Sequence, residues 1–554
     1  MKNLYLVWTN LRFHRHAIIE NKLHSRGKPL ISLILSSRDR LFVLCVTAIL
    51  LVCITVPYFV AEQSAGESLV FGGFLLNPID GMSYLAKMYQ GYRGDWLFTL
   101  PYTAEKGQGA WVFQLYILLG HLARFMGISL LYIYHGARIL FAAIMSLAIF
   151  RFCQTYLSIG KSSRLAFLLA IFGSGLGWLV LPFDAFTSDF WVAEAYPFLS
   201  AYTNPHFALS LTFLLFLLSP VKVPAANQSM RKSLVFSVLR ISLPSFALAM
   251  MSPFAVVIAL SIWAGMLFWD FLQATLEHSK VELRGYIYRL VWIGIGGAPI
   301  LVYQYIVMNS DPLFSEWMIQ NITPSPPIWD AMISLSPLLL LVPYGAWVII
   351  LNRNKEQRLL LVWVVVSLIL LYTPFSLQRR FMMGIYVPVA ILAAMSIDWM
   401  IKDGCRFWIR SLLLLLIVLP TNLLILRAAW HGIQTRDDRL YLSTDEIDAL
   451  AWVEENSPSD ALILAAPETG LFIPAITGRR VIYGHPFETV HAEEQEERVL
   501  NFYQGVPLPN PKAWLDLVDY VYYGPREREI GKNELLDALK AVFHNQSVVI
   551  YATK

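Results

Sequence analysis

One long stretch, unusually rich in polar and aromatic residues, follows the first long apolar segment of the chain. It lies within residues 64–129 and contains the sequence NPIDGMSYLAKMYQGYRGDW, in which the carboxylate is Asp80. Positions i, i+4 and i+7 share one helix face, so a helix beginning at Asp80 would place Tyr84 and Lys87 beside it. A carboxylate held in this way could act as a general base. The alternative is that Asp80 only caps the helix.

A second stretch, residues 173–210, carries Asp184, Asp189, Glu194 and His206 without any Lys or Arg. Acidic loop residues are usually only solvated, and His206 could simply cap the helix that follows. The functional alternative is that two of these carboxylates share a divalent cation or divide the roles of base and positioning group. The spacing does not identify a metal.

Two adjacent arginines, Arg379 and Arg380, occur in SLQRRFMMGIYVP, at the start of an apolar segment. If that end of the segment faces outward, the pair opposes the positive-inside rule and needs anionic partners. Lipid headgroups are one candidate partner. A bound lipid-linked phosphate is the other, because the guanidinium fork matches two phosphate oxygens.

These residues must be positioned by membrane helices. The chain has 554 residues, of which 56% are hydrophobic and only 15% are charged, far from the usage of soluble domains. A helix needs about 20 apolar residues to cross the hydrocarbon core. The eleven spans predicted on this basis lie near residues 41–61, 130–150, 165–182, 207–220, 233–251, 253–273, 290–308, 329–351, 359–375, 382–400 and 411–429.

The distribution of charge predicts the orientation of these spans. If the basic segment 1–40 is cytoplasmic, every loop on the same side is basic, whereas the opposite loops 183–206 and 309–328 have no Lys or Arg. The basic residues of the inside loops are Arg151, Lys161, Arg164, Lys222, Arg231, Lys232, Lys280, Arg284, Arg289, Arg353, Lys355, Arg358, Lys402, Arg406 and Arg410. An odd number of spans then places the C-terminus outside. Segment 111–128, interrupted by His121 and Arg124, is expected to lie in the outer interface.

From about residue 435 to 554 the sequence predicts a small extracytoplasmic α/β domain with a net charge of −9. Its expected helices are 444–456, which begins with a capping box, 490–503 and 532–542. Its expected strands are 461–466, 481–484, 518–524 and 547–553. Four tail residues are candidates for substrate contact, and the alternative for each is a turn: Glu468, Gly484, His485 and Pro486.

Several function classes are excluded. The basic excess of the membrane part belongs to its inside loops, so it does not indicate a nucleic-acid partner. There is no glycine-rich dinucleotide or P-loop motif, so no nucleotide cofactor is expected. The four cysteines have no metal-ligand spacing.

This layout resembles the GT-C superfamily of membrane glycosyltransferases, which includes protein O-mannosyltransferases, aminoarabinose transferases and oligosaccharyl transferases. The resemblance rests on Asp80 early in the first outer loop, acids in the next outer loop, Arg379 and Arg380, and an outer C-terminal domain. It implies a membrane domain over residues 41–430. It also implies sugar transfer from a polyprenyl-phosphate donor to an acceptor outside the cytoplasm, with the loop acid as catalytic base.

The resemblance places the protein in a bacterial-type plasma membrane, in contact with membrane lipid. Asp80, Asp189 and Glu194 are the candidate catalytic acids. Arg379, Arg380, His206, Tyr84 and Lys87 are the candidate substrate-binding residues. Two alternatives to an enzyme stay open: a secondary transporter or flippase, and a non-catalytic component of cell-envelope polysaccharide export. An enzyme is distinguished from both by Asp80 and the arginines meeting at one outer site. The sugar and the acceptor are not identified by the sequence.

Overall fold

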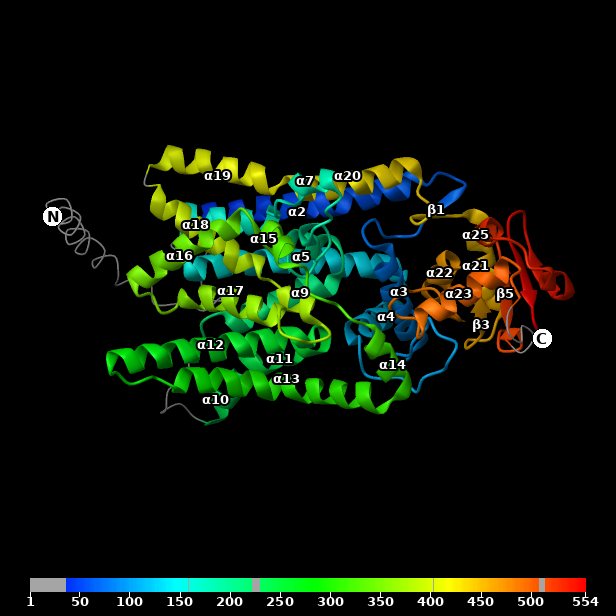
Figure 1. The fold of residues 1–554 in the computed structure, drawn as a ribbon, viewed down its shortest axis with the longest axis horizontal. Helices are drawn as coiled ribbons and strands as arrows, with labels where there is room; N and C mark the ends of the chain where they lie inside the picture. Colours follow the sequence, from blue (N-terminus) through cyan, green and yellow to red (C-terminus); the bar gives the residue numbers. More distant parts are fainter. Residues whose placement is uncertain (1–35, 158, 222–229, 402, 508–513) are drawn as a thin grey trace.

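A computed structural model describes residues 36–157, 159–221, 230–401, 403–507 and 514–554. The predicted basic segment 1–40 lies almost entirely outside the described residues, as does most of the inside loop that begins at Lys222. The remaining chain forms an elongated helical bundle, with an α/β domain at one end (Figure 1).

Among the described residues, six helices are long and apolar enough to cross a membrane. They are α2 (Ser37–Ser64), α5 (Leu130–Tyr156), α12 (Pro253–Glu277), α13 (Arg284–Ser310), the continuous helix Lys232–Met251 and the helical segment Gln378–Met400. The helix Lys232–Met251 begins at the third residue of α10 (Met230–Ser237). It continues through the π-helical turn η4 (Val238–Ser242) and α11 (Leu243–Met251). Gln378–Met400 comprises η5 (Gln378–Met382) and α18 (Tyr386–Met400). These six coincide with six predicted spans.

The other five predicted spans have a less simple form. Three are pairs of helices bent by 44°, 77° and 41°. These pairs are α6 (Lys161–Phe172) with α7 (Gly177–Val180) and η2 (Leu181–Phe183), α15 (Ile328–Leu335) with α16 (Leu338–Asn352), and α19 (Gly404–Val418) with α20 (Pro420–Thr435). The last two, α9 (Pro205–Leu218) and α17 (Arg358–Leu371), have 14 residues each, fewer than a straight crossing needs. The described helices therefore support six to nine spans, and the count of eleven stays a prediction.

Helix α18 forms the centre of the bundle. Every residue from Tyr386 to Ile397 is buried, and α5, α6, α16 and α17 pack around it. A helix that is apolar on all sides is stable only inside a bundle or in lipid. Because η5 leads directly into α18, this central position also fixes Arg379 and Arg380.

The loop of residues 64–129, predicted to be the first outer loop, is a folded unit built on α3 (Pro78–Arg93) and α4 (Gln114–Met126). The two helices cross at Gly91 and Gly120. A Cβ on Gly91 would lie 2.1 Å from the Ile117 carbonyl oxygen, and one on Gly120 would lie 1.9 Å from that of Met88. Only glycine permits this approach. The predicted helix within 111–128 is confirmed as α4, and it supports α3 from one side.

The C-terminal domain has a five-stranded mixed sheet with the strand order β4-β3-β5-β7-β6. The strands are β3 (Leu462–Leu464), β4 (Arg480–Val481), β5 (Tyr520–Tyr523), β6 (Lys540–His544) and β7 (Val549–Ala552). Its helices are α21 (Thr444–Asn456), α22 (Pro467–Thr477), α23 (Ala492–Tyr503) and α25 (Pro525–Ile530). The predicted strands and the capping box of α21 are confirmed.

One expected helix, 532–542, is wrong. The segment forms the short 3₁₀ helix η6 (Glu534–Ala538) and then β6, which pairs with β7. The spacing of apolar residues in ELLDALK suggested a helix. Strand pairing is favoured instead, because hydrogen bonding to β7 satisfies the backbone groups of residues 540–544. Helix α22 is an addition that the sequence analysis did not expect.

The domain is attached to the first outer loop through a second, two-stranded sheet. β1 (Leu69–Phe71) precedes α3 and pairs antiparallel with β2 (Tyr441–Ser443), which precedes α21. Helix α22 packs directly on α3, and α14 (Pro312–Gln320) lies beside the same unit (Figure 1). The domain, α3 and α4 thus form one cap at a single end of the bundle.

The predicted orientation can be tested by cysteine labelling. Glu497 is exposed on α23 of the cap, whereas the native Cys405 is exposed at the start of α19, at the opposite end of the bundle. We expect a Glu497→Cys variant to react with a membrane-impermeant maleimide in intact cells, and Cys405 to react only after permeabilisation. The reverse pattern would place the cap in the cytoplasm.

Candidate active site

Asp80 lies in the first turn of α3. The N-cap is Asn77, whose side chain accepts the Asp80 backbone N–H (3.3 Å) and whose amide donates to the Asp80 carboxylate (2.6 Å). The alternative that Asp80 itself caps the helix is therefore wrong: it is the third helical residue, held in reciprocal contact with the true cap. The Asp80 side chain is 38% exposed, so a ligand can approach it.

Three basic or polar side chains surround this carboxylate. His485 Nε2 lies 3.8 Å from Asp80 Oδ1, and Arg380 and Lys87 contribute positive charge. Burial acts to raise the pKa of the Asp80 carboxyl, but His485, Arg380 and Lys87 together outweigh it, so the pKa lies below its ordinary value. Asp80 is consequently ionised at neutral pH.

Aromatic rings form one wall of the site. Tyr84 stacks on Tyr116 with ring centroids 4.2 Å apart, and the Tyr116 hydroxyl is hydrogen-bonded to His206 Nδ1 at 2.6 Å. The His206 ring also lies against Tyr84, at 5.2 Å between centroids. The predicted residues Tyr84 and His206, which belong to different outer loops, are thus brought together at α3.

Lys87 makes a buried ion pair across the boundary between the loop and the C-terminal domain. Its ammonium lies 2.5 Å from Glu488 Oε1 and donates to the Ser83 hydroxyl at 2.7 Å, and Ser83 in turn donates to Glu488. The Lys87 side chain is completely buried, and that of Glu488 is 10% exposed. Burial acts to raise the pKa of the Glu488 carboxyl, but Lys87, His485 and Ser83 together outweigh it, so the pKa lies below its ordinary value.

The two arginines have different surroundings. Arg380 pairs with Glu194 at 3.3 Å, while the Glu194 backbone carbonyl accepts the Gly384 N–H. Arg379 lies over the ring of Trp191 at 4.6 Å, and its buried Nε has no hydrogen-bond partner in the described protein. Glu194 therefore links the second predicted outer loop to the arginine segment, and the charges of both arginines interact with Asp80.

Asp189, the remaining candidate acid, occupies a different place. It is fully buried, and its carboxylate accepts hydrogen bonds from the backbone N–H groups of Gly175 and Gly177 and from the hydroxyls of Thr187, Ser334 and Thr421. None of these five bonds goes to the other candidate residues. An acid satisfied in this way ties the loop between α6 and α8 (Pro197–Tyr202) to its neighbours. Asp189 itself lies in the short 3₁₀ helix η3 (Ser188–Phe190).

In the described part of the chain, the candidate acids are not gathered into a ligand set for a divalent cation. No group of three or more His, Cys, Asp or Glu side chains in the described part of the chain is arranged to hold a metal. Asp80 and Glu194 each face a basic or imidazole partner instead. We therefore derive no step through a metal.

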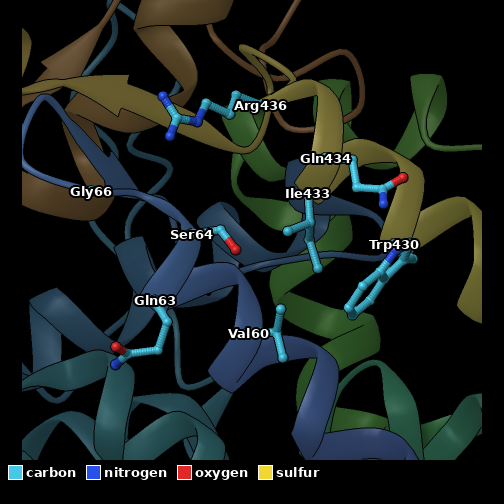
Figure 2. Close-up of a pocket in the computed structure, with 8 residues that line it drawn as sticks. All are labelled: Val60, Gln63, Ser64, Gly66, Trp430, Ile433, Gln434 and Arg436. Atoms are coloured by element: carbon cyan, nitrogen blue, oxygen red, sulfur yellow. The ribbon is translucent and has the colours of Figure 1, made fainter.

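A separate groove of about 430 Å³ lies where α2 and α20 end, and it is not part of this site. Figure 2 shows Gln63 and Ser64 on one side and Trp430 and Gln434 on the other. Its only charged lining residue is Arg436, and it holds none of the carboxylates described above. The groove lacks the groups that acid–base chemistry requires.

Sequence reasoning found Asp80, Tyr84, Lys87, Glu194, His206 and Arg380, which the fold brings together, but it missed Glu488. Of its four tail candidates, His485 meets Asp80, whereas Glu468 is exposed on α22. The only signal for Glu488 was an acidic residue three positions after His485 and two after Pro486. A partner 401 positions away cannot be read from local spacing.

The Lys87–Glu488 pair should hold the domain against α3. Removal of one partner from a buried ion pair typically costs about 3–5 kcal/mol, because the other charge is left unpaired. We expect Lys87→Met and Glu488→Gln each to lower the unfolding midpoint of the purified protein, and the double variant to be less destabilised than the two effects added. Exposed Lys106→Met, which breaks a surface pair with Asp460, is the control and should have little effect. Strict additivity of the first two changes would show that the pair does not couple the two parts.

No protein-family model matches the chain, and no curated protein sequence matches it. Several solved structures do match the chain in fold. One is the Archaeoglobus fulgidus oligosaccharyltransferase tethered to an acceptor peptide, with TM-score 0.53, 14% identity and coverage of 94% of this chain and 74% of that one. Another is AglB of the same organism with an inhibitory peptide and a dolichol-phosphate (TM-score 0.52, 13% identity, 88% and 70% coverage).

A third is the arabinofuranosyltransferase AftD from Mycobacteria, with TM-score 0.50, 14% identity and coverage of 94% of this chain but 40% of the larger AftD chain. These proteins belong to the GT-C superfamily of membrane glycosyltransferases. At such low identity the likeness concerns the fold. The protein has the GT-C fold.

Proposed function

We propose that this protein is a membrane glycosyltransferase that moves a sugar from a polyprenyl-phosphate donor to an acceptor on the outer face of the membrane. One observation carries the proposal. An ionised carboxylate, Asp80, and a cationic side chain, Arg380, share one partly open site between the bundle and its cap. The fold, shared with glycosyltransferases, supports the same function.

The chemistry requires three things of the protein: a base for the acceptor hydroxyl, positive charge for the departing phosphate and shelter from water. Asp80 meets the first need because it is ionised and approachable. Arg380 and Arg379 meet the second, since Arg379 Nε is a buried donor without a partner. The rings of Tyr84 and Tyr116, together with the cap, supply the third.

A lipid-linked donor is supported by two features. Arg379 and Arg380 begin the apolar segment Gln378–Met400, so a phosphate bound there would keep its polyprenyl chain beside membrane helices. One structure that shares the fold, AglB, contains a dolichol-phosphate. We infer the same class of donor here.

The rival proposals are less well supported. A transporter places ionisable groups near the membrane midplane on broken helices. The cluster here instead lies on a loop helix, a domain turn and the outer end of a central helix. A scaffold has no reason to bring together Asp80, Arg380 and His485, which come from three separate parts of the chain.

Asp80→Asn tests the base directly. The amide preserves shape and can keep the contact with Asn77, but it cannot accept a proton. We expect the variant to fold, to bind donor, and to transfer sugar at least about 100-fold more slowly in proteoliposomes. Because the pKa of Asp80 is lowered, the acid limb of the wild-type rate profile should lie below the pH at which an ordinary aspartate protonates. Near-normal transfer by the variant would remove Asp80 from the mechanism.

The arginines are tested by donor binding. Loss of one charge-assisted contact costs about 1.5–3 kcal/mol, or roughly 10- to 150-fold in affinity. We expect Arg379→Ala and Arg380→Ala each to weaken binding of a polyprenyl phosphate within this range, and lysine to restore it only in part. Arg436→Ala, in the separate groove, is the matched control. Unchanged affinity in both alanine variants would reduce the pair to headgroup anchors.

A further inference from the structure

The turn that carries His485 determines which ring nitrogen bears the proton. His485 Nδ1 accepts the backbone N–H groups of Phe487 and Glu488, both at 3.1 Å. A nitrogen that accepts two hydrogen bonds must offer a lone pair, so the ring proton resides on Nε2. The ring is further held between Tyr102 and Phe487, with centroids 5.5 Å and 6.3 Å away. His485 is therefore an oriented donor that projects from the C-terminal domain.

This donor has no partner within the described protein. Nε2 is buried and makes no hydrogen bond, although the His485 side chain is only 2% exposed. Its nearest ionic neighbour is Asp80 Oδ1 at 3.8 Å, beyond the usual hydrogen-bond range of about 2.7–3.2 Å. A buried donor left unsatisfied is unfavourable, and such a group beside a partly exposed carboxylate indicates where a ligand atom belongs.

The two groups are close enough to share one oxygen atom placed to the side of the line that joins them. An oxygen about 2.8 Å from each would accept from Nε2–H and donate its own proton to Asp80. An alcohol does both through a single atom. A carboxamide nitrogen cannot, because its lone pair is delocalised and it only donates. The pair therefore discriminates between the two common kinds of glycosyl acceptor.

We propose that His485 and Asp80 together bind the acceptor hydroxyl, and that the acceptor is consequently an alcohol, such as a sugar hydroxyl, and not an amide. This proposal rests on the proposed function and adds the acceptor class and the role of His485. In the transfer step the hydroxyl proton passes to Asp80 and the oxygen bonds to the anomeric carbon. The bond from that carbon to the phosphate oxygen breaks, and the electron pair leaves with the polyprenyl phosphate. His485 keeps its proton throughout and aligns the oxygen.

His485→Asn separates this role from turn formation. The asparagine Oδ1 occupies the place of Nδ1, so it can still accept the two backbone N–H groups, but the Nε2 donor is lost. His485→Gln does the opposite, since it offers an N–H near the Nε2 position and loses the turn acceptor. His491→Asn is the matched control, because His491 is 59% exposed and lies outside the cluster.

The assay uses a short-chain prenyl-phosphate monosaccharide as donor. Alkyl glycosides and water serve as hydroxyl acceptors, and an asparagine peptide serves as the amide acceptor. We expect His485→Asn to keep its unfolding midpoint and its donor affinity, while kcat/KM towards hydroxyl acceptors falls about 10- to 100-fold. His485→Gln should recover part of the loss, His491→Asn should match the wild type, and the peptide should not be glycosylated.

Two results would overturn the proposal while leaving the proposed function intact. They are normal hydroxyl transfer by a stable His485→Asn variant, and transfer to the peptide as fast as to the glycosides. A wild-type protein that neither transfers nor hydrolyses any such donor would contradict the proposed function itself. Nitrogen-15 NMR of ring-labelled histidine, assigned by the loss of one signal in His485→Asn, gives a readout independent of activity. A protonated Nδ1 in His485 would contradict the inference in either case.

Discussion

The buried ion pair between Lys87 and Glu488 is the contact on which the site depends. It joins a helix of the first outer loop to a domain some 400 residues later in the chain, at 2.5 Å and almost without solvent. Charges in such surroundings are stable only when they are paired and hydrogen-bonded, and Ser83 supplies the additional bonds. The pair holds the turn 485–488 against α3, where His485 lies beside Asp80.

Several weaker contacts act in the same direction. β1 pairs with β2, Tyr102 donates to the Leu471 carbonyl, and Arg480 donates to the Ala104 carbonyl. The opposite side of the site is fixed from within the bundle, where α18 is buried along its whole apolar length and carries the arginine segment before it. Asp80 thus lies on the cap where it meets the arginine segment of the central helix, and both parts are held by many contacts. Such rigidity suits chemistry in which the protein contributes mainly position and charge.

Much of the fold follows from the sequence because its causes are local. Long apolar runs predicted α2, α5, α12 and α13, and the capping box at Ser443 predicted the start of α21. The face shared by Asp80, Tyr84 and Lys87 followed from helix geometry alone. The segment 532–542 was wrong because sheet pairing, a non-local interaction, outweighed its helical spacing. The bends between paired helices could not be predicted for the same reason.

The sequence pointed to the acids and arginines of the candidate site. It could not show which of these residues belong to the site. Asp189 and Glu194 look equivalent in the sequence, yet hydroxyls and backbone groups surround the first and Arg380 meets the second. Only packing separates them. Glu488 had no pattern to reveal it, because its partner lies in a distant part of the chain.

The most direct test of this account is a structure of the protein with a polyprenyl phosphate bound. We expect the phosphate oxygens within hydrogen-bond distance of Arg379 or Arg380, the polyprenyl chain along the bundle, and the Asp80 carboxylate facing the position of the sugar. A phosphate bound elsewhere, such as in the groove between α2 and α20, with Asp80 and the arginines untouched, would contradict the central claim that these residues form one active site.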